Sequence, residues 1–549
     1  MVSSILLWRV FHGFDWSDDS YYSSIVYRFI QGDSLFQSSW DIHQISTVIL
    51  FPLFWIYTKI LGTTGIILFS RVVFVVIQTV EAIGLFYKFN KKNNCIWSIL
   101  AALVLLCYES NYGLSYNAMM IESFVMAFLL LPTKEGTHSH FRFLCCGVFS
   151  GIAIQSYPST FLVVICFIVF ILLNGKELRW NNIMWYISGG TLVIIYFVVF
   201  LSLNSSFEAL KSNAHYLFTD PEHGKIIFSI RDHFQNLKDL IGHRGLQILL
   251  IADAIAIISW FTKRKISVVL RIALFAILLF YILSQWMDVR VDYGKRQIQY
   301  QLFFSVSMVF PTLWLLSRLK WDNIILLFLG GTVASIGVNI ATNNGETFYV
   351  YPYIISAIAT VIYIGKTIQI KRGRLMILMT SFCPLSLSIV SLIAYLFCAS
   401  INYVYRDSPL DSLNARMETG PAAGIYTTQE RASKYEETIE AIANYIPQKG
   451  CVLYCKLLPF GYLCNEVKPA TPRLWRTNLD YEMFEEYYQN NPDRKPDAIY
   501  IVDEDYGITN SGIVIGEYMK SYIDSTPHKT IELQCATIYL FEEDCNDKN

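Results

Sequence analysis

Apolar runs long enough to cross a membrane recur along the first 400 residues, and they constrain the fold more than any other feature. A helix needs about 20 consecutive apolar residues to cross a bilayer, and we count thirteen candidate runs, some of them shorter. Charged residues make up only 16% of the 549 residues, against about 25% in soluble globular proteins. The sequence therefore predicts a polytopic α-helical membrane protein with about 13 transmembrane helices and excludes a soluble multidomain protein.

Lysine and arginine are unevenly distributed between the short loops that join these runs. One set of loops holds sixteen of them, whereas the opposite short loops hold none. Because cytoplasmic loops carry the excess of Lys and Arg, we expect a multi-pass protein of the cell (cytoplasmic) membrane with its N-terminus inside and its tail outside. The first run, residues 1–14, is short and contains Arg9 and His12, so either the true start lies upstream or the membrane is thin there.

The outer side carries most of the polar chain. Residues 15–64 form a first outer loop, and residues 401–549 follow the last span. In this tail, helical patterns alternate with strand patterns, which predicts an extracytoplasmic α/β domain; the helices are expected at 437–446, 481–491 and 516–523, and the strands at 450–456 and 497–502. We therefore expect a transmembrane catalytic domain over 1–400 and an active surface outside. The net charge of −1 gives no support to nucleic-acid binding.

Two adjacent carboxylates, Asp18 and Asp19, directly follow the first run. They begin a pattern whose apolar residues recur at helical spacing and predict an interfacial helix; these residues are Tyr22, Ile25, Val26, Phe29 and Ile30. A carboxylate at the water–lipid boundary can deprotonate an acceptor hydroxyl or amine, and two together can hold a divalent cation. The alternative is structural, because Asp is a favoured N-cap and suits the positive end of the helix dipole.

Asp41 and His43 precede a second apolar run, residues 45–61, which we expect to be interfacial rather than spanning. His43 could hydrogen-bond a phosphate or a carboxylate, or be an ordinary surface group. With the acidic pair, the segment QGDSLF (31–36) and Arg71 at the start of the next span, this layout resembles the GT-C superfamily of membrane glycosyltransferases. It is most similar to bacterial members of the branch that includes the protein O-mannosyltransferases and the aminoarabinose transferases.

The resemblance implies an inverting transfer of a sugar from a polyprenyl-phosphate donor to a glycan, lipid or protein acceptor on the outer face of the membrane. It implies that Asp18, helped by Asp19, is the catalytic base and that His43 contacts the donor phosphate. The family pair is usually Asp-Glu, and two prolines often precede the second interfacial helix, whereas here the pair is Asp-Asp and no proline follows His43. The residues expected in the substrate pocket are Asp41, Glu109, Tyr116 and Asn117.

A donor phosphate needs cationic partners. Arg290, Lys295 and Arg296 lie in an outer region that is otherwise poor in charge and could bind it. The alternatives are ordinary contact with lipid headgroups and neutralisation by the neighbouring Asp288 and Asp292. Within the spans, Glu81 and Glu122 are costly to bury and are therefore candidates for function, unless a buried base such as Arg71 pairs with one of them.

Two other functions fit the same topology. A polysaccharide polymerase or ligase acting on polyprenyl-linked glycans would depend on outer-loop arginines more than on Asp18. A transporter or flippase would have paired inverted repeats and broken helices at the midplane, and no such symmetry is visible in the sequence.

Overall fold

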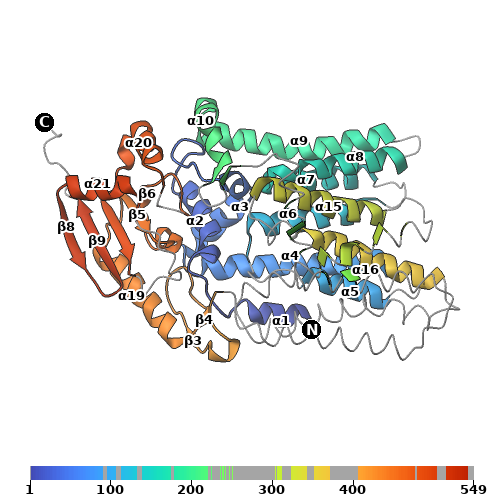
Figure 1. The fold of residues 1–549 in the computed structure, drawn as a ribbon, viewed down its shortest axis with the longest axis horizontal. Helices are drawn as coiled ribbons and strands as arrows, with labels where there is room; N and C mark the ends of the chain where they lie inside the picture. The colour runs from blue at the N-terminus through green and yellow to red at the C-terminus, as the bar shows by residue number, and fades with distance from the viewer. Residues whose placement is uncertain are drawn as a thin grey trace.

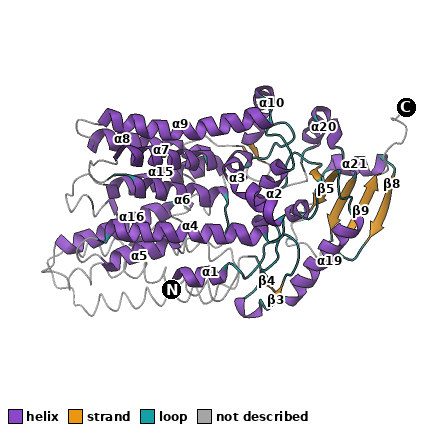
Figure 2. Ribbon diagram, turned by 180° about the vertical axis from the view of Figure 1, so that it is seen from behind, coloured by secondary structure: helices purple, strands orange, loops and turns teal. Residues whose placement is uncertain are grey.

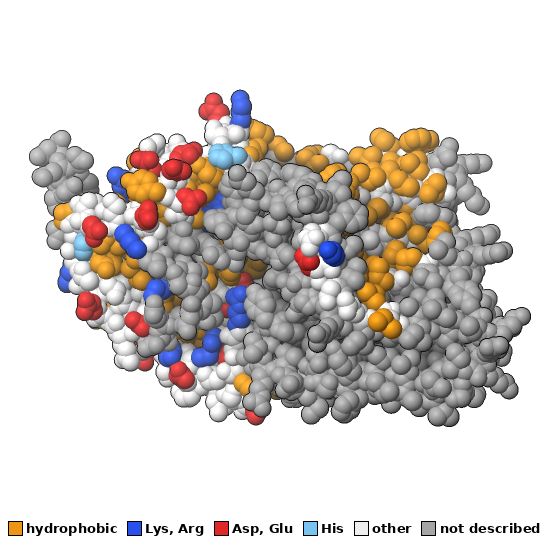
Figure 3. All heavy atoms as spheres, viewed as in Figure 1, with side chains coloured by type: hydrophobic (Ala, Val, Ile, Leu, Met, Phe, Trp, Pro, Cys, Tyr) orange, Lys and Arg blue, Asp and Glu red, His pale blue; other side chains and the backbone are white. Residues whose placement is uncertain are grey.

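The computed structural model places a helical bundle at one end of the molecule and an α/β tail at the other (Figure 1). It describes isolated residues between 235 and 314 and the ranges 2–90, 95–106, 113–132, 139–174, 179–220, 224–225, 323–342, 352–370, 406–475, 479–503 and 515–541. In the space-filling view, charged side chains gather on the tail, whereas the described surface of the bundle is mainly hydrophobic (Figure 3).

The described part contains three helices that are long and apolar enough to cross a membrane, Gln44–Leu61, Ile66–Phe89 and Trp180–Asn204, together with shorter apolar helices. The predicted count of about 13 spans exceeds what these residues display and stays a prediction. The helices of the bundle are α1 Val2–Arg9, α4 Ile66–Phe89, α5 Cys95–Leu106, α6 Tyr116–Leu130, α7 Ser139–Ser156, α8 Leu162–Asn174, α9 Arg179–Asn204, α15 Asn323–Thr342 and α16 Tyr353–Ile370.

The first predicted span, residues 1–14, is wrong in extent. α1 ends at Arg9, whose Nη1 donates to the carbonyl oxygen of His12 at 2.8 Å. The chain then turns toward the tail, where the Gly13 amide donates to the carbonyl oxygen of Tyr426 at 2.6 Å. Eight helical residues reach about 12 Å, well short of a hydrocarbon core of about 30 Å.

Helix α2 (Asp18–Ile30) lies between the bundle and the tail (Figure 1). Of its apolar residues, Ile25, Val26 and Phe29 are buried and Tyr22 and Ile30 are half-buried, but Ser20, Ser24 and Arg28 on its polar side are buried too. The tail covers this side, where Ser24 Oγ donates to the carbonyl oxygen of Pro459 at 2.8 Å. The sequence predicts an interfacial helix with one face exposed to water. In the structure, both faces of α2 are covered by protein.

Helix α3 (Gln44–Leu61) follows α2 and packs against it. It is long and apolar enough to cross a membrane. In Figure 1, however, α3 is seen nearly end-on beside α2, whereas α4 and α9 run along the long axis of the molecule. This crosswise placement is what we expect of an interfacial helix.

The tail is built on a five-stranded mixed sheet with strand order β6-β5-β7-β9-β8 (Figure 2). β5 pairs in parallel with β6 and β7, whereas β9 is antiparallel to β7 and β8. Each helix and strand that the sequence predicts in the tail is present. Their bounds are α19 Gln429–Tyr445, β5 Cys451–Cys455, β6 Lys468–Pro469, α20 Tyr481–Asn490, β7 Ala498–Val502, α21 Glu517–Ser525, β8 His528–Glu532 and β9 Ala536–Phe541.

Backbone hydrogen bonds tie the start of the tail to the bundle. The Gly65 amide, just before α4, donates to the carbonyl oxygen of Gly420 at 3.0 Å. The Tyr426 amide donates to the carbonyl oxygen of Phe11, just after α1, at 2.6 Å. The segment that precedes α19 is thus part of the surface on which α1, α2 and α4 meet.

The two acids expected within spans meet each other. Glu81 of α4 and Glu122 of α6 share a side-chain hydrogen bond, and both are buried. Two carboxyl groups can share a hydrogen bond only if one of them carries a proton. Arg71, their expected partner, lies about 15 Å from Glu81 along α4 and pairs with Asp19 instead.

Candidate active site at the start of α2

The acidic pair begins α2, but neither member caps the helix. The N-cap position is Ser17, whose side chain makes no capping hydrogen bond. Asp15 takes that role: its Oδ2 accepts the amide of Asp18 at 3.0 Å, and its Oδ1 accepts the amide of Ser17 at 3.1 Å. Asp15 therefore caps the helix. Asp18 and Asp19 lie in its first turn, where negative charge suits the helix dipole, and each of them pairs with an arginine.

Asp19 is buried and locked to Arg71 of α4. Arg71 Nη2 lies 2.5 Å from Asp19 Oδ2, and the Asp19 side chain is 3% exposed. The same guanidinium donates to the carbonyl oxygens of Val10 and Gly13, each at 2.8 Å. Burial raises the pKa of the Asp19 carboxyl, against the opposing effect of Arg71. Asp19 thus fastens the start of α2 to α1 and α4.

Asp18 is the accessible member of the pair. Its side chain is 22% exposed, and its Oδ2 lies 3.0 Å from Nη1 of Arg406. Arg406 also donates to Ser17 Oγ at 2.8 Å and contacts Asp15 Oδ2 at 3.3 Å. Sequence reasoning missed Arg406, because nothing in the local pattern links it to the first aspartates of the chain; Asp15, for example, lies 391 positions away.

An aromatic box stands next to the acidic pair, formed by His43, Tyr116, Tyr22, Tyr157 and Tyr21. The His43 ring stacks on Tyr116 with a centroid distance of 3.9 Å and an interplanar angle of 16°. Tyr22 and Tyr157 lie 5.8 and 5.4 Å from Tyr116, and Tyr21 lies 5.9 Å from His43. Because Tyr22 is one helical turn after Asp18 and Asp19, the box and the carboxylates adjoin. The structure thus brings together His43 and Tyr116, two residues that the sequence analysis expects at the site in different roles.

Asp41 hydrogen-bonds two residues of the aromatic box. It is buried, and its Oδ1 accepts the Tyr21 hydroxyl at 2.6 Å and the His43 amide at 3.0 Å. Its Oδ2 accepts the amide of Leu474 from the tail at 3.3 Å. Three donors on one buried carboxylate make Asp41 a positioning residue for α2, α3 and the tail.

The remaining predicted site residues are Asn117, which the structure describes, and four residues that lie outside the described ranges. Asn117 is half-buried next to Tyr116 at the start of α6. Glu109, Arg290, Lys295 and Arg296 lie outside the described residues. Within the described ranges, no group of three or more His, Cys, Asp and Glu side chains is arranged to hold a metal ion, and Asp18 and Asp19 pair with different arginines.

Comparisons with known proteins identify structures of similar fold but no sequence relative. No family model matches the chain, and no curated protein matches it. Among solved structures, it is similar to the Archaeoglobus fulgidus oligosaccharyltransferase in complex with Zn and sulfate, with a TM-score of 0.44 and 10% identity over 98% of this chain and 73% of that chain. The archaeal oligosaccharyltransferase AglB from Archaeoglobus fulgidus, in complex with an inhibitory peptide and a dolichol-phosphate, gives 0.44 and 9% over 99% and 74%. At these scores and identities, the likeness assigns neither a family nor an activity to this chain.

Proposed function

We propose that this protein is a membrane glycosyltransferase that moves a sugar from a polyprenyl-phosphate donor to a glycan, lipid or protein acceptor at the outer face of the membrane. One observation carries the proposal: Asp18 is a partly exposed carboxylate beside an aromatic box, at the junction of apolar helices and a polar tail. Sugar transfer uses a base to deprotonate the nucleophile of the acceptor. It also uses aromatic side chains, which pack against the apolar face of the sugar ring.

The step that this geometry supports is a direct displacement. Asp18 accepts the proton of an acceptor hydroxyl or amine, whose oxygen or nitrogen forms a bond to the anomeric carbon. The bond from that carbon to the phosphate oxygen breaks, and polyprenyl phosphate leaves with the electron pair, which inverts the anomeric centre. Since Arg406 contacts the Asp18 carboxylate, the acceptor has to approach beside this guanidinium or displace it.

The donor phosphate requires positive charge. Arg290, Lys295 and Arg296 remain the proposed phosphate partners, together with His43 of the aromatic box. A divalent cation could replace Arg406 at Asp18, because carboxylates are preferred ligands of hard cations. If so, transfer will be lost on chelation with EDTA and restored by Mg²⁺ or Mn²⁺.

The test is transfer from a panel of radiolabelled polyprenyl-phosphate sugars in membranes that hold equal amounts of wild type and Asp18→Asn. We expect a fall of about 10²-fold or more, the scale of a lost general base. Asp411→Asn, which removes an exposed carboxylate near the start of the tail, is the matched control and should leave the rate unchanged.

Two results would contradict the proposal. Transfer that survives Asp18→Asn keeps the reaction but removes Asp18 as its base. No transfer by the wild type from any donor contradicts the reaction itself and favours the polymerase or transport alternatives.

A further inference from the structure

Three polar side chains with carbonyl or carboxylate oxygens lie together inside the bundle, between α4 and α6. Glu81 of α4 and Glu122 of α6 share a hydrogen bond and are 1% and 5% exposed. Gln78 lies one turn before Glu81 on the inward face of α4 and is fully buried. Side chains three residues apart are neighbours on a helix. Acids buried in this way among apolar helices are costly and mark a candidate functional site.

The side-chain amide of Gln78 is turned toward this carboxyl pair. Its Nε2 donates to the carbonyl oxygen of Leu105 on α5 at 3.4 Å. Helix α4 runs between α5 and α6 and packs against both (Figures 1 and 2). Because the oxygen and the nitrogen of a planar amide point in different directions, Gln78 Oε1 faces away from α5, on the side of Glu81 and α6.

Two buried oxygen atoms at this place have no hydrogen-bond donor within the described structure, Gln78 Oε1 and Glu81 Oε2. The proton shared by the two carboxyl groups satisfies the other oxygen of Glu81 and leaves these two without a partner. Buried acceptors are costly without a donor or a positive charge. Carboxylate and amide oxygens are also the ligands that hard cations prefer.

The basic residues of the three helices α4, α5 and α6 are Arg71 and Lys88, and both are engaged away from the pair. Arg71 lies about 15 Å from Glu81 along α4 and is bound at the start of α2. Lys88 lies about 10 Å from Glu81 in the other direction and donates to the carbonyl oxygens of Leu129 and Leu131. Positive charge at the pair therefore comes from a proton or from a bound ion.

We propose that Gln78, Glu81 and Glu122 form a binding site for a monovalent hard cation, Na⁺, which exchanges with the proton that the two carboxyl groups share. When Na⁺ enters, the proton leaves to water, so the site carries one net negative charge in both states. Two carboxylates and one amide offer at most five oxygen atoms, fewer than the roughly six or more that Mg²⁺ and Ca²⁺ take. This site does not depend on the proposed function.

Dicyclohexylcarbodiimide can test the exchange, because it modifies carboxyl groups that are protonated in apolar surroundings. We expect it to modify Glu81 or Glu122 of the full-length protein in nanodiscs in choline chloride, and about tenfold more slowly in NaCl of equal ionic strength. Equal rates in the two salts would overturn the inference, and a buried water at the two oxygen atoms would produce that result. Protection by MgCl₂ but not by NaCl would overturn the assignment to a monovalent ion.

The pH dependence of this protection tests whether a proton leaves when Na⁺ binds. One proton released per ion means that a rise of one pH unit lowers the Na⁺ concentration for half-protection about tenfold. A concentration that stays constant with pH would overturn the exchange.

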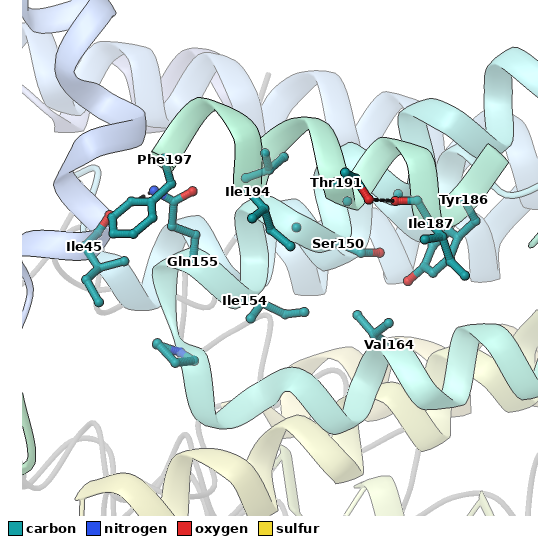
Figure 4. A pocket seen from close by; sticks show the side chains of 15 residues that line it. Ile45, Ser150, Ile154, Gln155, Val164, Tyr186, Ile187, Thr191, Ile194 and Phe197 are labelled. Carbon is teal, nitrogen blue, oxygen red and sulfur yellow. Dashed lines mark hydrogen bonds between the residues drawn. The ribbon is translucent and has the colours of Figure 1, made fainter. Parts of the chain in front are cut away.

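Two buried glutamines of the bundle provide matched variants. Gln78→Leu keeps both carboxyl groups and nearly the same volume, so it should still be modified in choline chloride. It should need about tenfold more Na⁺ for half-protection, because one ligand is lost. Gln155 of α7 also has an Oε1 without a hydrogen-bond partner in the described structure, but it lines a cavity between α7, α8 and α9 to which none of the three proposed ligands contributes (Figure 4).

Gln155→Leu should therefore need the same Na⁺ concentration as the wild type. Equal behaviour of the two variants, whether both keep the protection or both lose it, would overturn the site. Glu81→Gln and Glu122→Gln each remove one ligand and the shared proton, and each should abolish the difference between NaCl and choline chloride. A difference that persists in either variant would likewise overturn the site.

Discussion

At the residue scale, burial separates aspartates that look alike in the sequence. Asp15, Asp33 and Asp41 are almost fully buried, and their carboxylates form hydrogen bonds or ion pairs with neighbouring residues. Asp19 is locked to Arg71, and Asp18 alone of the acidic pair keeps an accessible carboxylate. Environment, rather than residue type, therefore decides which of these groups can meet a substrate.

We expect Asp19→Ala to destabilise the protein far more than Asp18→Ala. The first leaves the Arg71 guanidinium buried without its carboxylate, which costs about 3–5 kcal/mol. The second breaks a partly exposed pair, which is worth about 1 kcal/mol or less. Thermal unfolding of the two variants in the same detergent measures the difference, and equal losses would contradict the roles assigned to the two residues.

Burial also controls the tail cysteines. Burial raises the pKa of the Cys451 thiol to about 11, so its thiolate fraction at pH 8 is on the order of 10⁻³. We expect iodoacetamide to modify Cys451 at least about 100-fold more slowly in the folded protein than in urea at pH 8. The rate should rise about tenfold per pH unit between pH 7 and 9, since the thiolate is the reactive form. Rapid labelling of the folded protein, followed by peptide mass spectrometry, would refute this.

At the element scale, a buried charge network fastens α2 to the tail. Asp33 lies 2.6 Å from Arg28 of α2 through one oxygen and 2.6 Å from Arg494 of the tail through the other. Asp33 is fully buried, whereas Asp493, which also contacts Arg494 at 3.7 Å, is 74% exposed. The two carboxylates share a partner but differ in their environment.

This difference gives a matched pair of variants. Asp33→Ala leaves two buried arginines without their carboxylate and should cost about 3–5 kcal/mol, whereas Asp493→Ala should cost about 1 kcal/mol or less. Limited proteolysis of the full-length protein should then release tail fragments from Asp33→Ala at a lower protease concentration. Identical digestion patterns would show that the network does not hold the tail.

The contact of α7 with α9 makes a second prediction at this scale. Gly147→Ala should strongly destabilise the bundle, because its Cβ would lie 1.9 Å from the Tyr186 carbonyl oxygen. Gly190→Ala should be tolerated, since its Cβ has 3.8 Å of clearance. Comparison of the monodisperse yield and melting temperature of the two variants tests this. A well-folded Gly147→Ala protein would disprove the close helix contact.

At the scale of the whole molecule, α4 connects the tail junction to the far end of the bundle. It begins next to Gly65, which bonds the tail, and its 24 residues reach about 36 Å. This exceeds the hydrocarbon thickness of about 30 Å, so the two ends of α4 are expected on opposite sides of the membrane. The orientation with the tail outside stays a prediction from the loop charges.

Cysteine accessibility in intact cells tests that orientation. Asp524→Cys places a thiol on the exposed surface of α21, and Asn90→Cys places one just beyond the exposed end of α4. A membrane-impermeant maleimide should label the first in intact cells and the second only after permeabilisation. The reverse pattern would place the tail inside the cell and exclude an outer-face reaction.

The sequence determined the elements whose signals are local. Hydropathy defined the apolar helices of the described ranges, and the alternation of patterns in the tail predicted three helices and the strands β5 and β7. It missed β6, β8 and β9, and α19 begins at Gln429, before the predicted start at 437. The adjacency of Asp18 and Asp19 and the position of His43 before α3 also needed no fold. The first span failed because apolar composition does not show where the chain turns, and here the turn follows Arg9 to meet the tail.

Only the tertiary structure decided which charges meet. Arg406, Arg71 and Arg494 pair with Asp18, Asp19 and Asp33 from distant parts of the chain, and no period or motif encodes such pairs. The close contact of α7 with α9 likewise arises only because Gly147 faces the carbonyl oxygen of Tyr186 in space. Local patterns fix helices because their hydrogen bonds are local, whereas a site built from long-range ion pairs depends on packing that the whole chain sets.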